Sequence, residues 1–353
     1  MGMTQPSAEV VRFLGDRKVD LHPTEPLVPA PDQVRLRTLY SGISSGTELA
    51  TYAGSNPYLH RGWNAESRLF LDGSPSIEYP VAGAGYEEVG EVVEVGAQSD
   101  GVEVGDLVWG IWGHRSDGVL AAADAAAQKL PVGIDPLTGV FARVGAVALN
   151  AVIDADVHVG ETVAVFGQGV IGLLATRLLS LSGADVIAID LEPQRLRLSR
   201  EFGARHTMLA TDDPAEVVRD LTAGLGADVC IELSGSYRAL QEAIRTCAYS
   251  GRVIASGFYQ GDATGLRLGE EFHHNRIELV SSQISGPPPR YAHRWTRQRL
   301  HRGFMRLVTQ ARIDPLPLVS RVLPASEVSK AFELITDTPG VLQVVLDFSQ
   351  EAR

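Results

Sequence analysis

The pattern of apolar and polar positions changes character part-way along the chain. Up to about residue 140, short β-branched runs are separated by proline and glycine clusters, as in 33–39, 90–95 and 106–111. Such runs are typical of a strand-rich domain with many turns. From Gly139 onward, segments with helical spacing alternate with compact apolar runs, which indicates a parallel sheet covered by helices. The pattern therefore predicts two structural regions.

The central region has the clearer alternation. We expect helices at 139–154, 192–202 and 237–248, and strands at 162–166, 186–189, 227–233, 252–256 and 277–282. The proline run at 287–289 cannot continue a helix or a central strand, so it marks the end of this region. The prediction is a doubly wound α/β domain over 141–289. A β-rich domain comprises 1–140 and 290–353, with the final segment folded back onto the N-terminal part.

A glycine-rich turn lies between the first strand and helix of the central region. Its six residues are Gly167, Gln168, Gly169, Val170, Ile171 and Gly172. In a dinucleotide site, the first glycine permits a tight turn, the second lets the backbone approach a pyrophosphate, and the third lets the helix pack on the strand. The amide groups at the helix N-terminus complete an anion site. A strand–turn–helix context makes this fingerprint much more specific than the glycines alone.

Asp190 ends the next strand, about 20 residues after the turn, where an acidic residue binds the adenosine ribose. Such a carboxylate repels a 2′-phosphate and favours NAD, whereas Arg195 and Arg197 leave NADP as the alternative. Ligands bind at the carboxyl ends of parallel strands. The further cofactor contacts expected there are Ser234, Ser256, Gly257 and Ser282.

Composition narrows the class of protein. The 353 residues carry a formal net charge of -12, which argues against general affinity for nucleic acid. No apolar run of bilayer length and no signal peptide is visible, so we expect a cytoplasmic protein without a membrane partner. Two cysteines are too few for a disulfide framework. The adjacent pair His273 and His274 is not expected to bind a metal, because neighbouring side chains point in different directions.

Two further segments carry alternatives. Residues 290–312 form a basic amphipathic pattern, interpreted as a solvated helix face or, through Arg290, Arg294 or Arg297, as a holder of an anionic substrate group. Aromatic side chains between residues 53 and 79 could line a substrate pocket or pack the core of their own domain.

Four stretches taken together resemble the medium-chain dehydrogenase/reductase superfamily: YSGISSGTE at 40–48, GYEEVGEVVEVG at 85–96, VGDLV at 104–108 and VAVFGQGVIG at 163–172. The resemblance covers nearly the whole chain. It implies a GroES-like β-rich catalytic domain, a Rossmann domain, and an active site in the cleft between them. It also implies a small-molecule substrate and a homodimer or homotetramer formed through the strand at 277–282.

The chain departs from the zinc-type members at the metal ligands. The family's cysteine, histidine and third-ligand positions read Ser44, Tyr86 and about Ala142 here. These residue types do not supply the thiolate, imidazole or carboxylate donors of a catalytic zinc. The structural zinc of the family needs four closely spaced cysteines, which this chain lacks. We therefore expect a nicotinamide cofactor and no zinc.

Without a metal, the proton of the reacting alcohol needs another partner. Tyr86 is the first candidate because it takes a ligand's position, although a buried packing role remains the alternative. A tyrosine can donate to a ketone, and it can act as a base only where a positive neighbour lowers its pKa. Ser44 is expected to support it, Glu87 to act as a structural or supporting acid, and His60 or His114 to relay protons. Glu48 is interpreted as part of a Ser45–Glu48 capping box.

The sequence thus predicts a zinc-independent NAD(P)-dependent oxidoreductase that transfers hydride between nicotinamide and a secondary alcohol or ketone. A polar substrate is favoured, such as a sugar, a cyclitol or an intermediate of secondary metabolism. The alternatives are an NADPH-dependent quinone or enoyl reductase and a catalytically silent nucleotide-binding protein.

Overall fold

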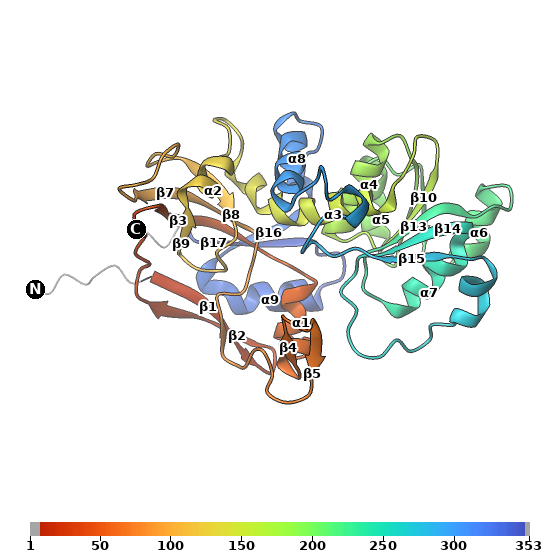
Figure 1. Cartoon of the computed structure of the whole chain (residues 1–353), viewed down its shortest axis with the longest axis horizontal. Coiled ribbons are helices and arrows are strands. Elements are labelled where there is room, and N and C mark those ends of the chain that lie inside the picture. The colour runs from red at the N-terminus through yellow and green to blue at the C-terminus, as the bar shows by residue number, and fades with distance from the viewer. Residues whose placement is uncertain (1–7, 350–353) are drawn as a thin grey trace, which may run out of the picture. The chain divides into compact units, whose positions relative to one another are not determined.

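The computed structural model describes residues 8–349, and the chain divides into two compact units (Figure 1). One unit extends to Arg143 and resumes at Asp314, and the other is Val144–Ile313. Residues 290–313, expected in the β-rich domain, belong instead to the second unit. The reason is packing: the Phe304 ring lies so close to Gly145 that a side chain there would collide with it.

The first unit is built on a sheet with the strand order β16-β17-β3-β7-β8. Its strands are β3 (Gln33–Ile43), β7 (Glu88–Val95), β8 (Leu107–Gly110), β16 (Val319–Pro324) and β17 (Gln343–Asp347). Strand β9 (Asp117–Ala121) also pairs with β3. Because β17 pairs antiparallel with β3, the end of the chain folds back onto the N-terminal part, as predicted.

A smaller sheet and further α-helices belong to the described part of the first unit (Figure 1). The sheet has the order β2-β1-β6, from Lys18–Thr24, Ala8–Gly15 and Val81–Ala82. The helices are α1 (Thr47–Tyr52), α2 (Ala122–Ala127) and α9 (Val328–Asp337), and β4 (Gly62–Asn64) pairs with β5 (Leu69–Leu71). Phe332 of α9 is fully buried and meets Phe13 edge-on, with ring centroids 5.2 Å apart. Helix α9 thus contributes to the core over the small sheet.

The second unit contains a six-stranded parallel sheet with the order β12-β11-β10-β13-β14-β15. The strands are β10 (Thr162–Phe166), β11 (Asp185–Asp190), β12 (His206–Leu209), β13 (Ala227–Glu232), β14 (Cys247–Ala255) and β15 (Glu278–Ser281). Strand order reverses at β10, which has β11 on one side and β13 on the other. Ligands bind at such a point, beyond the carboxyl ends of the strands.

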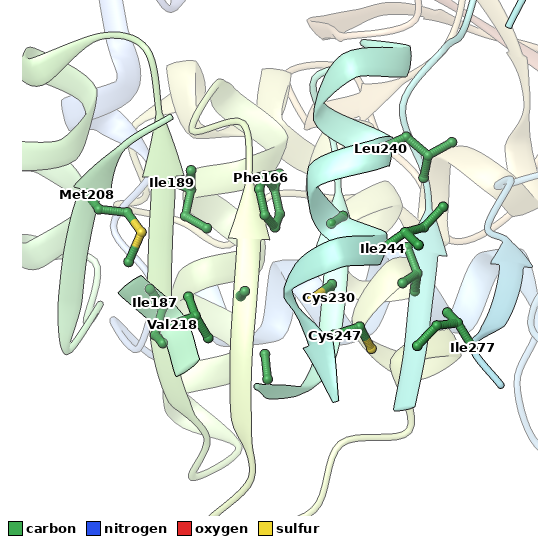
Figure 2. Close-up of a cluster of buried hydrophobic side chains, with 14 residues drawn as sticks. Phe166, Ile187, Ile189, Met208, Val218, Cys230, Leu240, Ile244, Cys247 and Ile277 are labelled. Atoms are coloured by element: carbon green, nitrogen blue, oxygen red, sulfur yellow. The ribbon is translucent and has the colours of Figure 1, made fainter. Parts of the chain in front are cut away.

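Six α-helices accompany this sheet: α3 (Phe141–Ala155), α4 (Val170–Leu181), α5 (Pro193–Glu201), α6 (Pro214–Leu221), α7 (Tyr237–Thr246) and α8 (Arg297–Thr309). Figure 2 shows the core between the strands and α7, where Phe166, Ile187 and Ile189 lie with Leu240 and Ile244. Each large apolar side chain buried in this way stabilises the fold by roughly 1.5–3 kcal/mol. The core therefore determines where the strands end, and hence where the turns after them lie.

Two local features differ from what the sequence pattern indicated. Strand β12 was not predicted, because a four-residue segment with one buried side chain has no clear period. The helical segment Pro136–Ala155 is long and apolar enough to cross a bilayer, yet 67% of its apolar window is buried inside the structure. Such burial is what the core helix of a globular protein shows.

Candidate active site

The glycine turn after β10 has the backbone geometry that its residues predict. Gly167 has φ +88°, which favours glycine, and a side chain there would meet the Ser234 amide nitrogen at 2.8 Å. A side chain at Gly172 would collide with the Gly167 carbonyl oxygen. Beside Gly169 there is open space, and no side chain caps α4 at this residue. The turn thus leaves room for a ligand at the helix N-terminus, where anions bind.

Gln168 of the turn points inward rather than toward a ligand. Its side chain is fully buried, and its Nε2 donates to the Val165 carbonyl oxygen at 3.1 Å. Its Oε1 accepts from the hydroxyls of Thr176 and Ser199, each at 3.0 Å. The side chain of Gln168 therefore joins the turn to α4 and α5, and its contribution to a cofactor site is to hold the turn in shape.

Asp190 at the end of β11 lies against the same turn. Its carboxylate accepts the backbone amides of Gln168 at 2.5 Å and Glu192 at 2.8 Å, and it is 7% exposed. Arg195 approaches it, with 4.0 Å between Nη1 and Oδ2. A carboxylate held by two amides has a fixed orientation, which suits the recognition of ribose hydroxyls.

Glu232 is a further buried acid at this sheet edge, which the sequence interpretation missed. It ends β13, and its carboxylate accepts the amides of Ser234 at 2.7 Å and Gly235 at 3.1 Å. The hydroxyls of Ser234 and Tyr259 also donate to it. Burial raises the pKa of Glu232, while these donors partly oppose the shift. The carboxyl group thus fixes the turn that packs on Gly167; its place at a parallel strand end was the available signal.

The remaining predicted cofactor residues follow the neighbouring strands. Ser256 and Gly257 come directly after β14, and the Ser256 hydroxyl is buried without a hydrogen-bond partner among the described residues. A side chain at Gly257 would collide with Gly235. Ser282 follows β15, and its hydroxyl accepts from Asn150 of α3 at 3.2 Å. Of these groups, the Ser256 hydroxyl is the one left available for a ligand.

In the first unit, Ser44 and Tyr86 lie together. Their hydroxyls form a short hydrogen bond although 42 residues separate them in sequence, and the nearby Thr47 hydroxyl acts to lower the pKa of Tyr86. We refer to Ser44, Thr47 and Tyr86 as the hydroxyl cluster. Ser44 is buried, whereas Tyr86 is only partly buried and Thr47 is exposed. The cluster therefore joins the interior of the unit to its surface.

The charges around Tyr86 decide how it can act. Burial raises its pKa, and the negative charges of Glu87 and Glu48 raise it further. A positive neighbour, which a tyrosine base would need, is not among the causes of the shift. Tyr86 is therefore suited to donate a hydrogen bond or a proton, and poorly suited to act as a base at neutral pH.

Glu87 is buried beneath the hydroxyl cluster. Neither of its carboxyl oxygens has a hydrogen-bond partner among the described residues. The side-chain amide of Gln343 lies near the Glu87 carboxyl group, and both groups are beside Gly42. Burial raises its pKa strongly, and the charges of Glu48 and Glu88 add to the shift. An unpaired buried carboxylate is costly, so burial favours the neutral form of Glu87 over its charged form.

Glu48 and His114 have partners that the sequence interpretation did not anticipate. The capping box was wrong: Gly46 is the N-cap of α1, without a side-chain cap. The Glu48 carboxylate instead contacts Nε2 of His114 at 2.7 Å, and Nδ1 of His114 lies 2.6 Å from the Ser41 hydroxyl. His114 is fully buried rather than solvated. Burial alone would lower its pKa, but the carboxylates of Glu48 and Glu88 raise it overall.

Among the described residues, His60 does not interact with the hydroxyl cluster or with Glu87. It is exposed, and its Nε2 is 2.8 Å from the Gly54 carbonyl oxygen. No hydrogen bond or ion pair joins it to Ser44, Tyr86 or Glu87 within residues 8–349. The nearby aromatic side chains pack on one another, with Phe70 about 5 Å from both Tyr58 and Trp63 between ring centroids (5.2 and 5.0 Å). The geometry thus gives His60 no partner role in the hydroxyl cluster.

The donor set of the hydroxyl cluster does not fit a catalytic zinc. Its members are neutral hydroxyls bonded to one another, and Ala142 is a buried apolar residue at the start of α3. Zinc in catalytic sites takes thiolate, imidazole or carboxylate donors. The three residues at the family's ligand positions supply none of these.

Comparisons with known proteins agree with this architecture. Residues 170–296 match the model of a family described as zinc-binding dehydrogenase. D-guloside 3-dehydrogenase of Escherichia coli K12 is 32% identical over 302 residues, 83% of this chain and 85% of the relative.

This chain belongs to the medium-chain dehydrogenase/reductase superfamily. Sorbitol dehydrogenase of Halalkalibacterium halodurans is 25% identical over 339 residues, covering 87% of this chain and 89% of the relative. A crystal structure of a Sinorhizobium meliloti 1021 protein bound to NADP has a TM-score of 0.76 at 21% identity, covering 97% of this chain and all of that one (100%). Membership makes the protein an NAD(P)-dependent dehydrogenase or reductase with a Rossmann-like domain and a separate β-rich domain.

Proposed function

We propose that this member of the superfamily is a zinc-independent dehydrogenase that interconverts a secondary alcohol and a ketone on a sugar or polyol. The observation that carries the proposal is the hydroxyl pair of Ser44 and Tyr86 at two ligand positions of the zinc-type enzymes. The relatives named for D-guloside and sorbitol support a substrate rich in hydroxyl groups.

The second unit offers the residues that would hold the nicotinamide cofactor. The open space beside Gly169 and the amides of α4 suit the pyrophosphate, and the Asp190 carboxylate suits the ribose hydroxyls. This carboxylate favours NAD over NADP because it would repel a 2′-phosphate. Nicotinamide, when bound, accepts hydride from an alcohol or gives it to a ketone.

The first unit would manage the proton. In ketone reduction, the Tyr86 hydroxyl donates to the carbonyl oxygen and stabilises the negative charge that develops there. Its raised pKa keeps it protonated at neutral pH. Because the Tyr86 proton goes to the substrate, the hydroxyls of Ser44 and Thr47 donate to the Tyr86 oxygen and hold it in one orientation. In alcohol oxidation, the same hydroxyls would relay the proton from the alcohol to solvent at the exposed Thr47 side chain.

The test begins with the Tyr86→Phe variant, which removes one hydroxyl and keeps the ring. Turnover should fall about 10²-fold or more, as for the loss of a general acid, while cofactor affinity is retained. Tyr249→Phe is the matched control because Tyr249 is a well-exposed tyrosine of the second unit. Unchanged turnover in Tyr86→Phe would remove this residue from the chemistry.

The substrate class and the metal need separate measurements. Purified protein is assayed with NAD and NADP against glycosides and polyols, and in parallel against quinones and enones. Oxidation of polyols that survives a chelator supports the proposal. Stoichiometric zinc whose removal abolishes turnover would contradict it. NADPH-dependent reduction of quinones or enones alone would favour the reductase alternative, and cofactor binding without any turnover would favour a silent nucleotide-binding protein.

A further inference from the structure

His114 lies at the junction of the segments that carry the hydroxyl cluster. Its backbone is held from two sides: its amide donates to the Ala84 carbonyl oxygen, and its carbonyl oxygen accepts from Val11 of β1, each at 2.8 Å. The imidazole is fully buried, and the Phe332 ring lies edge-on to it, with centroids 6.4 Å apart. The ring therefore has a fixed place from which its two nitrogens can act.

One nitrogen holds the strand that leads to Ser44. Nδ1 of His114 lies 2.6 Å from the hydroxyl of Ser41, on β3, and this hydroxyl donates to Glu88 at 3.1 Å. A serine has a single proton, so a Ser41 that donates to Glu88 accepts from Nδ1. Nε2 faces the Glu48 carboxylate and donates as well. Both nitrogens then carry protons, and His114 is the cation between the carboxylates of Glu48 and Glu88.

The other nitrogen holds α1. This six-residue helix has no side-chain cap at its N-terminus, and Glu48 directly follows Thr47 of the hydroxyl cluster. The 2.7 Å contact between Glu48 and His114 is buried on both sides, with side-chain exposures of 3% and 0%. Breaking a buried pair from one side is strongly destabilising locally, so this contact fixes the first turn of α1.

The imidazole also lies against Gly85, the residue before Tyr86. Gly85 has φ +117°, and a side chain on it would lie 2.9 Å from two atoms of the His114 ring. The ring thus occupies the space that a side chain would take. The His114 imidazole therefore lies against Ser41, Glu48 and Gly85, which belong to the segments that carry Ser44, Thr47 and Tyr86.

We propose that His114 and Glu48 are positioning residues that hold the three hydroxyls of the cluster in register for proton transfer. The proposal rests on the proposed function, in which Tyr86 donates to the substrate. Neither residue needs to touch the substrate, because both act through the segments they join.

The main test is a double-mutant cycle with Tyr86. Glu48→Leu, which removes the acceptor for Nε2, should lower kcat about tenfold or more and leave the cofactor Kd unchanged. Glu48→Gln retains an acceptor oxygen and should stay within about threefold of the original turnover. In the Tyr86→Phe background, Glu48→Leu should add less than about twofold, because the hydroxyl through which it acts is gone. An equal loss in both backgrounds would overturn the proposal.

Controls and a second readout separate positioning from general damage. Glu94→Gln and His22→Gln change an exposed carboxylate and an exposed imidazole of the same unit, and both should leave kcat unchanged. Hydrogen exchange should accelerate at the amides of residues 50–53, which close the turns of α1, in Glu48→Leu and in His114→Gln, but not in the controls. Unchanged exchange there would overturn the proposal. This measurement is independent of turnover, so it decides the positioning role even if Tyr86→Phe proves fully active.

Discussion

The two units use buried carboxylates in different ways. In the second unit, Asp190 and Glu232 accept backbone amides of the turns that directly follow their strands, and Asp190 also accepts the Gln168 amide from the turn after the adjacent strand β10. In the first unit, Glu48 contacts a histidine 66 residues away, and Glu87 has no geometric hydrogen-bond partner among the described residues. The first arrangement stabilises local turns, whereas the second brings distant segments together. A nucleotide site can thus be built largely from local backbone geometry, while the hydroxyl cluster depends on the tertiary fold.

The largest effect is expected from adding a methyl group to the glycine turn, which tests whether local backbone geometry forms the nucleotide site. Gly172→Ala would place its Cβ against the Gly167 carbonyl oxygen, so the turn or α4 must shift. Overpacking of this kind costs about 1–3 kcal/mol, and we expect cofactor affinity to fall about tenfold to a hundredfold with a lower Tm. Isothermal titration with NAD and thermal unfolding measure both.

Gly169→Ala is the matched variant in the same turn. Open space surrounds this position and its backbone is extended, so the fold should tolerate the methyl group and Tm should stay unchanged. Affinity for NAD should still fall, because the methyl group occupies the approach of the pyrophosphate. Undiminished NAD affinity in Gly169→Ala would show that the phosphates do not approach this residue.

Asp190→Ser should change cofactor preference. The carboxylate that repels a 2′-phosphate is lost, so the ratio of NADP to NAD affinity should rise about tenfold, equivalent to ~1.4 kcal/mol. NAD affinity should also fall, since the amides of Gln168 and Glu192 lose their acceptor. Kd values for the two cofactors decide the matter, and an unchanged ratio would mean that Asp190 does not face the ribose.

Glu232→Gln should have a smaller effect on the same site. The amide oxygen can take the place of one carboxylate oxygen and its two donors, but the NH₂ group that replaces the other oxygen cannot accept from the backbone amide and the hydroxyl that face it. We expect cofactor Kd to rise about threefold to tenfold with kcat nearly retained, by the loss of about 1 kcal/mol of hydrogen bonding. Glu242→Gln, on the neighbouring helix α7, serves as the control. Equal changes of the cofactor Kd in Glu232→Gln and Glu242→Gln would show that Glu232 makes no specific contribution to cofactor binding.

Glu87→Gln should have the smallest effect on cofactor binding, and its effect should appear in the pH dependence of stability. The folded pKa of Glu87 is raised, so between its ordinary and raised values the folded state binds more protons than the unfolded state. Stability therefore falls as pH rises through that window, by ~1.4 kcal/mol per pKa unit. Glu87→Gln should remove this slope and gain stability relative to the original protein toward alkaline pH. Parallel curves of unfolding free energy against pH would show that the Glu87 pKa is not raised.

Particular residues show how far sequence reasoning reached. The glycine turn and the parallel sheet were predicted because their signals are local and periodic, and the fold-back of the final segment was predicted without its pairing partner, which the structure shows to be β3. The proximity of Ser44 and Tyr86 was predicted from the family resemblance, and the structure places their hydroxyls in contact. His60 was named with them but shares no interaction with them in the described part of the chain. Glu232 was missed because its one signal, a place at the end of a parallel strand, does not by itself show that the acid is buried and bound to the following turn.

The sequence by itself determined the nucleotide-binding half of this protein, because glycine conformation, strand ends and helix starts depend on residues close in the chain. Tertiary structure alone decided the surroundings of Tyr86. Whether a tyrosine is an acid or a base depends on the sign of charges brought near it, and here burial and carboxylates raise its pKa. It also decided that Glu48 holds His114 rather than capping its own helix. Those contacts join segments far apart in the chain, so a local sequence pattern cannot predict them.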